Sequence, residues 1–207
     1  MIRLFLTIQI LMLGAAGFAQ QKRTDFLVSY TIKSKGNELM GYKTRAGKIV
    51  IPAQFIPDFG NDTLYERTFV VKPKAGLQGI DRTGKVILIP FIYDNGPDYM
   101  QEGFFRFVEN SKIGFADENW KKVIPAVFDF VEPFKNGVAK YTLGGHKIMD
   151  GEHWYWSEGY ENGYINRFNE RFKKVHELKA GVREAWTNKG QHVLLDKKGK
   201  IVKVFVK

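Results

Sequence analysis

The residues whose side chains are best suited to bind a ligand lie together between positions 144 and 160. This segment holds two of the four tryptophans and two of the four histidines of the chain. In an extended strand, Trp154 and Trp156 share one face and Tyr155 takes the other. Two exposed indoles would form a stacking platform for sugar rings or another ligand with an apolar face, with His153 as a polar partner. These residues form the candidate ligand-binding site.

Two other interpretations of the same segment stay open. A metal site would use four of its side chains: His146, Asp150, Glu152 and His153. However, two histidines separated by six residues on a glycine-rich loop have no recognised ligand spacing, and the adjacent Glu152 and His153 point apart in a strand. We therefore predict no metal and no cofactor, and keep Glu152 as a second polar partner of the platform. The third interpretation is an elongated hairpin that folds its aromatic side chains over the neighbouring core, since large aromatics are mostly buried for packing.

Motifs of catalysis are absent from the sequence. It has no Gly-x-Ser-x-Gly elbow and no His-Glu-x-x-His, and the Gly-x-x-x-x-Gly at 79–84 lacks the Lys-Ser/Thr of a phosphate-binding loop. The carboxylate pairs Asp58/Asp62 and Asp94/Asp98 follow prolines, where turn formation explains them. We expect a protein that is not an enzyme. The alternative is a hydrolase acting on a polysaccharide of the cell envelope, which two carboxylates about 5–10 Å apart in a cleft would support.

The elements that must position these residues repeat along the chain. The clearest recurrence is a four-residue turn that starts with Asp, Asn or Thr and mostly ends with Gly. The first side chain accepts a hydrogen bond from the backbone two residues on, and Gly supplies the left-handed conformation that closes a hairpin. Five copies start 30 to 49 residues apart, at Thr44–Gly47, Asp81–Gly84, Asp117–Trp120, Asn166–Asn169 and Asp196–Gly199. Trp120 fits the fourth position worst, which predicts another geometry for that turn.

Strand-like sequence flanks the turns and predicts an all-β fold. β-branched runs that stop at a proline follow three of the turns, at 48–52, 85–90 and 121–125. Proline cannot donate to a strand ladder, so it ends each run. Residues 26–33 and 38–43 predict a starting hairpin. At 169–179 helical spacing competes with strand, and the register of the repeat favours strand. Alternating valines and lysines at 201–207 predict a half-buried or edge strand.

One nearly complete unit combines a Gly-aromatic pair, an Asp turn, a Val-Ile-Pro run and a Phe-x-x-Gly-x-Ala segment. Its residues are Gly114, Phe115, Asp117, Lys121, Val123, Ile124, Pro125, Phe128, Asp129, Phe134, Gly137, Val138 and Ala139. This unit resembles the WG-repeat (KWG-repeat) family of bacterial proteins, over roughly residues 38–207. The tryptophan that precedes each glycine in the family is replaced by Met40, Gln78, Ile113 and Asn162, so the chain looks like a divergent member. Gly79 lies one residue nearer to its turn than the other copies, which predicts a register slip or bulge.

The repeat and the resemblance imply one kind of architecture. Such a period marks stacked units that cannot bury their apolar faces alone. We expect about four to five imperfect β-hairpin or three-strand repeats that form a curved or solenoid-like sheet, with a closed propeller-like or barrel-like arrangement as the alternative. The resemblance also implies a module that is often exported or on the cell surface, usually without a known reaction.

Residues 1–19 have the pattern of a secretory signal peptide, with one basic residue, an apolar run of about ten residues and a small-residue exit. The run is too short for a spanning helix, so we predict no membrane span in the mature chain, 20–207, which we treat as one domain. We expect an exported binding or structural module, periplasmic or extracellular. Its partner would be a glycan or a protein of the cell envelope, contacted through the segment 144–160.

The composition bounds the partners further. The chain carries 32 basic against 22 acidic side chains, a formal net charge of +10, and loss of Arg3 with the signal peptide leaves +9. This positive charge favours an anionic partner. No nucleic-acid-binding motif is present, so we expect no nucleic acid. The chain has no cysteine, which excludes a disulfide scaffold, an iron–sulfur protein and a thiolate zinc site.

Overall fold

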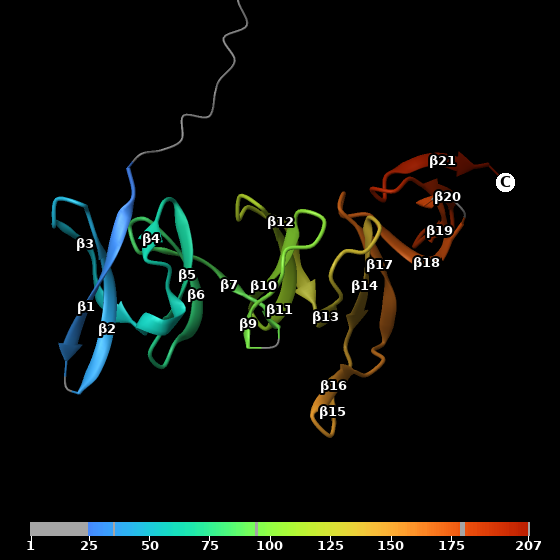
Figure 1. Cartoon of the computed structure of the whole chain (residues 1–207). Coiled ribbons are helices and arrows are strands. Elements are labelled where there is room, and N and C mark those ends of the chain that lie inside the picture. Colours follow the sequence, from blue (N-terminus) through green and yellow to red (C-terminus); the bar gives the residue numbers. More distant parts are fainter. Residues whose placement is uncertain (1–24, 35, 94, 179–180, 207) are drawn as a thin grey trace, which may run out of the picture.

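The computed structural model describes residues 25–206, except 35, 94, 179 and 180. The predicted signal peptide, 1–19, lies outside the described residues. Within them the regular structure is almost entirely β, with no α-helix, and includes the short 3₁₀ turn η1 (Pro57–Phe59). No helix in this part of the chain is long and apolar enough to cross a membrane. Figure 1 shows the strands arranged in a row from β1 to β21, with the two ends of the row far apart.

Five units of three antiparallel strands make up this row. They are β1 (Leu27–Ser34), β2 (Asn37–Lys43) and β3 (Ile49–Phe55); β5 (Arg67–Lys72), β6 (Gly76–Asp81) and β7 (Val86–Pro90); β10 (Phe104–Glu109), β11 (Lys112–Asp117) and β12 (Lys122–Phe128); β14 (Val138–Leu143), β17 (Glu161–Asn166) and β18 (Arg171–Glu177); and β19 (Arg183–Thr187), β20 (His192–Leu195) and β21 (Ile201–Phe205). Short strands connect or decorate them: β4 (Thr63–Leu64), β8 (Ile92–Tyr93), β9 (Gly96–Pro97), β13 (Phe130–Val131), β15 (Lys147–Asp150) and β16 (His153–Trp156).

The units join by one rule. The last strand of a unit, or the residues just after it, pairs with the first strand of the next unit, through the bridge Ile56–Val71, β7 with β10, β13 with β14, and β18 with β19. The result is an open array divided over a four-, a six- and a seven-stranded sheet, none of which closes on itself. The predicted all-β repeat fold is confirmed, with five units.

The apolar cores lie where the units meet. Four clusters of buried side chains occur, and each draws its members from two neighbouring units. Leu88 of the second unit, for example, is buried together with Phe105 and Phe107 of the third. No unit therefore buries its apolar face alone, as expected of stacked repeats.

The five predicted turns share one geometry. In each, the N–H of the fourth residue donates to the carbonyl of the first residue at 2.8–3.0 Å. In four of the five, the side-chain oxygen of the first residue also accepts two backbone N–H groups. The prediction of another geometry at Trp120 is wrong, because Trp120 adopts the left-handed conformation with φ 62°. A sixth copy that the sequence analysis missed, Thr187–Gly190, joins β19 to β20.

The glycine and proline of the repeated unit serve one feature, a bulge in its third strand. Where β11 advances by two residues, β12 advances by four around the proline. The bulged backbone lies against Gly114, so that an added Cβ there would lie 2.5 Å from the carbonyl oxygen of Ile124. Gly41 stands in the same relation to Ile51, at the same 2.5 Å. Only glycine fits so close an approach of two backbones.

Four further predictions are confirmed. The pairing of β6 with β7 shifts register at Gly79, as its early position in the motif predicts. Residues 169–179 contain the strand β18 rather than a helix, and the starting hairpin is β1–β2. At the far end β21 pairs only with β20 and is the edge of its sheet.

Candidate functional site

The insertion at 144–160 forms a two-stranded ribbon, β15–β16, at the end of the hairpin β14–β17. The register runs from Leu143–Glu161 at the base to Asp150–His153 at the tip. In Figure 1 the ribbon projects from the row of units beside β13 and β14. The fourth unit thus carries, in place of a tight turn, a ribbon that can reach across to the third.

Hydrogen bonds at its base fix the direction of this ribbon. The carboxylate of Asp129 accepts from the N–H of Gly144 at 2.7 Å and from the ammonium of Lys112 at 2.6 Å. Partial burial raises the pKa of Asp129, but these two contacts outweigh it and leave the pKa below its usual value. Across the ribbon, the indole N–H of Trp156 donates to the Gly144 carbonyl at 2.9 Å. The ribbon is therefore anchored to β12–β13 through Asp129 as well as by its own strands.

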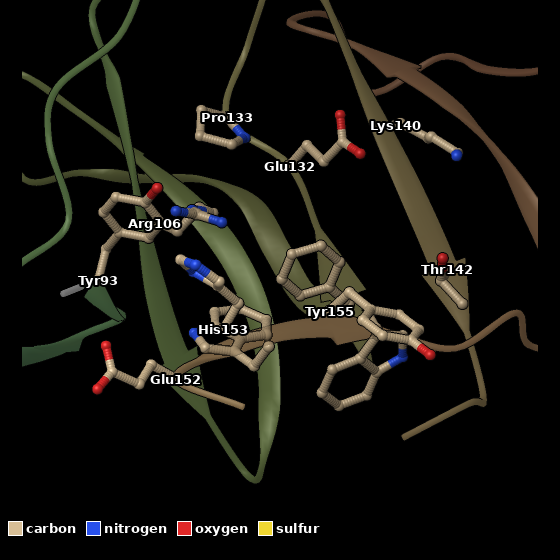
Figure 2. Close-up of a pocket in the computed structure, with 12 residues that line it drawn as sticks. Tyr93, Arg106, Glu132, Pro133, Lys140, Thr142, Glu152, His153 and Tyr155 are labelled. Atoms are coloured by element: carbon tan, nitrogen blue, oxygen red, sulfur yellow. The ribbon is translucent and has the colours of Figure 1, made fainter. Parts of the chain in front are cut away.

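A cavity of about 610 Å³ lies between the ribbon and the third and fourth units. Figure 2 shows the side chains around it. They are Tyr93, Arg106, Phe130, Glu132, Pro133, Lys140, Thr142, Glu152, His153, Trp154, Tyr155 and Trp156. All four residues predicted from the sequence as ligand-binding, together with Glu152, line this one cavity. Its size is within the usual range for small-molecule sites, roughly 300–1,000 Å³.

The two tryptophans are neither a free platform nor a buried core. Both are half-buried, and both contact Phe130 of β13. The Trp156 ring stacks on Phe130, with centroids 5.5 Å apart and planes 11° apart, whereas Trp154 meets it edge-on at 5.7 Å and 87°. Phe130 is the residue that holds the ribbon against the array. The indoles form two walls of an aromatic corner that opens on the cavity.

The other two predicted residues lie on the outer side of β16. The burial pattern of the strand alternates, so His153 and Tyr155 take the more exposed face and Tyr155 is 54% exposed. Both still border the cavity. His146 lies near the base, where its ring nitrogen is 3.3 Å from the hydroxyl of Ser157. Among the described residues, no group of three or more His, Asp or Glu side chains could hold a metal ion.

The floor of the cavity contains an ion pair that the sequence analysis missed. Arg106 is 1% exposed, and its guanidinium donates to both carboxylate oxygens of Asp98, at 2.8 and 2.6 Å. It also donates to the Val131 carbonyl at 3.0 Å and lies 4.3 Å over the ring of Phe91. The interpretation of Asp98 as a turn residue is therefore wrong: the carboxylate is buried because Arg106 pairs with it. No local signal pointed to this, since the two residues lie on different elements.

The remaining polar groups balance one another around the cavity. Glu132, Lys140 and Thr142 lie on one side, and Glu152 lies apart from them beside Tyr93 (Figure 2). Because Asp98 neutralises Arg106, the lining holds no excess of positive charge.

Of the other carboxylates considered from the sequence, only Asp62 has both a described side chain and a place outside the cavity lining. Asp94 lies outside the described residues, and the side chain of Asp58 is likewise not described. Asp62 lies in the first junction, where it accepts a long hydrogen bond from the Ser29 hydroxyl at 3.5 Å.

The fold and the site together define an open β-repeat array with a ligand-sized cavity at one junction. Two adjoining segments, residues 80–112 and 113–145, match the family described as "WG containing repeat". The chain thus contains two tandem segments that match the WG repeat, and the resemblance stated from its sequence is confirmed over these residues. The matched residues comprise β7 of the second unit, the whole third unit and β14 of the fourth. They include seven of the twelve residues that line the cavity but end before β15.

Similarity to other known proteins is slight. No curated protein matches the chain in sequence. Among solved structures, Hsv2p of Kluyveromyces lactis is 16% identical, with 86% of this chain and 60% of that chain covered and a TM-score of 0.26. A second structure of Hsv2 from the same yeast, with its loop 6CD complete, is 14% identical, with 88% and 63% covered and a TM-score of 0.26. The chain thus spans about three fifths of the length of these proteins, and likeness at this level carries no argument about function.

Proposed function

We propose that this WG-repeat protein is a binding module for a saccharide, held in the cavity between the ribbon and the third and fourth units. One observation carries the proposal: half-buried indoles and hydrogen-bonding side chains converge on a cavity of ligand size. A sugar ring has apolar faces that stack on aromatic side chains and hydroxyls that need polar partners. Trp154 and Trp156 supply the stacking surface. Glu152, His153 and Thr142 supply polar partners for the hydroxyls.

The charge of the lining supports a neutral or weakly charged ligand in the cavity. Lys140 is offset by Glu132 and Glu152, and the buried Arg106 is offset by Asp98. An anionic partner, which the overall charge favours, would contact the lysine-bearing surface outside the cavity. Such binding would weaken as ionic strength rises, whereas binding in the cavity would not.

We also propose that the mature chain is exported and acts in the bacterial envelope, on a glycan or on a protein that carries one. The signal-peptide pattern of residues 1–19 supports this place of action.

Binding to an array of neutral and acidic glycans, followed by calorimetry, tests the proposal. Trp154→Ala should weaken binding at least about tenfold, because it removes a wall of the cavity. Trp186→Ala is the matched control, since Trp186 is a half-buried indole of the fifth unit that does not line the cavity. A thermal melt of each variant should confirm that both remain folded. Equal affinities of the two variants, or no glycan bound by the wild type, would refute the proposal.

A hydrolase is the second candidate, because two carboxylates, Glu132 and Glu152, line the cavity. Such a pair could serve as general acid and as nucleophile or base. Release of new reducing ends from a polysaccharide that binds on the array would support this function. The activity should then be lost in both Glu132→Gln and Glu152→Gln, and its absence from the wild type would leave the module as a binder alone.

A further inference from the structure

A second cavity adjoins the first one, on the other side of the ribbon's aromatic wall. It measures about 520 Å³ and, like the first, is open to solvent. Four residues line both cavities: Phe130, Glu152, Trp154 and Trp156. The two hollows therefore share a wall, three members of which are aromatic rings.

Each cavity also has lining residues that the other cavity lacks. The first extends toward Tyr93, His153 and Thr142. The second extends toward Ile92 and Lys147, and the Lys147 ammonium lies 4.8 Å from the centre of the Trp154 ring. Trp154 thus lines two cavities with different lining residues, each with an aromatic surface and at least one charged hydrogen-bonding group.

We infer that the two cavities are adjacent subsites of one groove, and that the groove takes an extended oligosaccharide rather than a single sugar. This inference rests on the proposed function. A single ring can occupy only one side of the wall, which would leave the aromatic surface and the charged group of the other side unused. A chain of sugars that crosses the corner of Trp154 and Phe130 uses both sides. Glu152, which borders both cavities, would accept hydrogen bonds from hydroxyls of neighbouring sugars.

The construction of the groove supports a role in gripping a chain. The shared wall is built by the ribbon together with Phe130 of the link between the third and fourth units, whose ring contacts both indoles. Both ends of the groove are exposed, since Ile92 at one end is 57% exposed and Tyr155 at the other is 54% exposed. A ligand can therefore continue past either end, as a polymer must.

Calorimetric titration with oligomers of one to six units tests the inference, using β-1,4-linked glucose and β-1,4-linked N-acetylglucosamine series. Affinity should rise by roughly two- to tenfold for each added ring until both cavities are filled, and then level off. The variant Ile92→Arg should fill the mouth of the second cavity. It should cancel the gain of the longer oligomers and leave the affinity of the shortest binding oligomer unchanged. Val204→Arg is the matched control, an exposed apolar residue of the edge strand β21 that lines neither cavity.

The outcomes separate the inference from the proposed function. If the shortest sugar binds as tightly as the hexamer, or if Ile92→Arg keeps the full gain with length, the two-subsite groove is wrong while the saccharide site stands. If no member of either series binds the wild type at millimolar concentration, both are wrong for these glycans. The groove is supported if affinity rises with oligomer length in the wild type and in Val204→Arg but not in Ile92→Arg.

Discussion

Trp120 stacks on Phe69 of the preceding unit, with ring centroids 4.3 Å apart and planes 24° apart. The same residue occupies the left-handed position of its turn, where four of the other five copies have glycine and the fifth has Asn169. The ring also covers Gly79, whose added Cβ would come within 2.5 Å of the indole. Packing between units thus outweighs the backbone preference of the turn.

Trp120→Gly should therefore destabilise the protein, although glycine suits the backbone better. We expect a loss of about 2–4 kcal/mol in the free energy of unfolding, because the variant leaves a cavity between the second and third units. The matched control is Asn169→Gly, at the equivalent left-handed position with the same φ of 62°. Its side chain is exposed, so this change should stay within about 0.5 kcal/mol. Urea unfolding followed by circular dichroism measures both, and a stable Trp120→Gly would contradict the role of the stack.

Gly114→Ala should break the bulge of the third unit. The new methyl group would collide with the Ile124 carbonyl, 2.5 Å away, and neither backbone can move without loss of strand pairing. We expect a loss of about 1–3 kcal/mol in thermal or urea unfolding. Gly96→Ala is the control, because nothing lies within 4 Å of its added Cβ and its φ is not left-handed. The interpretation fails if the two variants unfold alike.

Asp98→Asn should lower the free energy of unfolding far more than the loss of an exposed ion pair does. It leaves the Arg106 guanidinium buried and without its counter-charge, for which about 3–5 kcal/mol is expected. Glu109→Gln removes the exposed partner of Lys122 and should cost less than about 1 kcal/mol. The double variant Asp98→Leu/Arg106→Met should recover part of the loss, because it removes the uncompensated charge, whereas the backbone N–H at position 106 and the Val131 carbonyl still lose their partners. Urea midpoints measure all three, and a double variant no better than Asp98→Asn would contradict this account.

The anchor of the ribbon should weaken in acid. The pKa of Asp129 is held below its usual value in the folded state, so its contribution to stability is complete above the ordinary value of about 3.8. It is lost as the pH falls through the lowered folded pKa. The difference in unfolding free energy between the wild type and Asp129→Asn should therefore be constant at neutral pH and shrink below about pH 4. A difference that stays constant down to the lowest pH would show that Gly144 and Lys112 do not favour the charged carboxylate.

Local sequence was sufficient to predict the repeated unit. Turns with Asp or Asn first and a left-handed fourth residue, strands that stop at proline, and glycines that admit a bulge all depend on neighbours a few residues away. For this reason the turn positions, the strand β18, the slip at Gly79 and the family resemblance could be predicted. The insertion at 144–160 stood out for the same reason, since it interrupts a period.

How the units pack, and which side chains they bury, depends on contacts that form only in the folded chain. Whether Asp98 forms a turn or neutralises a buried arginine depends on Arg106, which arrives from the next strand and brings no sequence signal with it. Whether Trp154 and Trp156 lie in solvent or in a core depends on Phe130, whose ring contacts both indoles and leaves the cavity beside them open. The strength of both contacts is set by burial in the folded chain and not by local backbone preference.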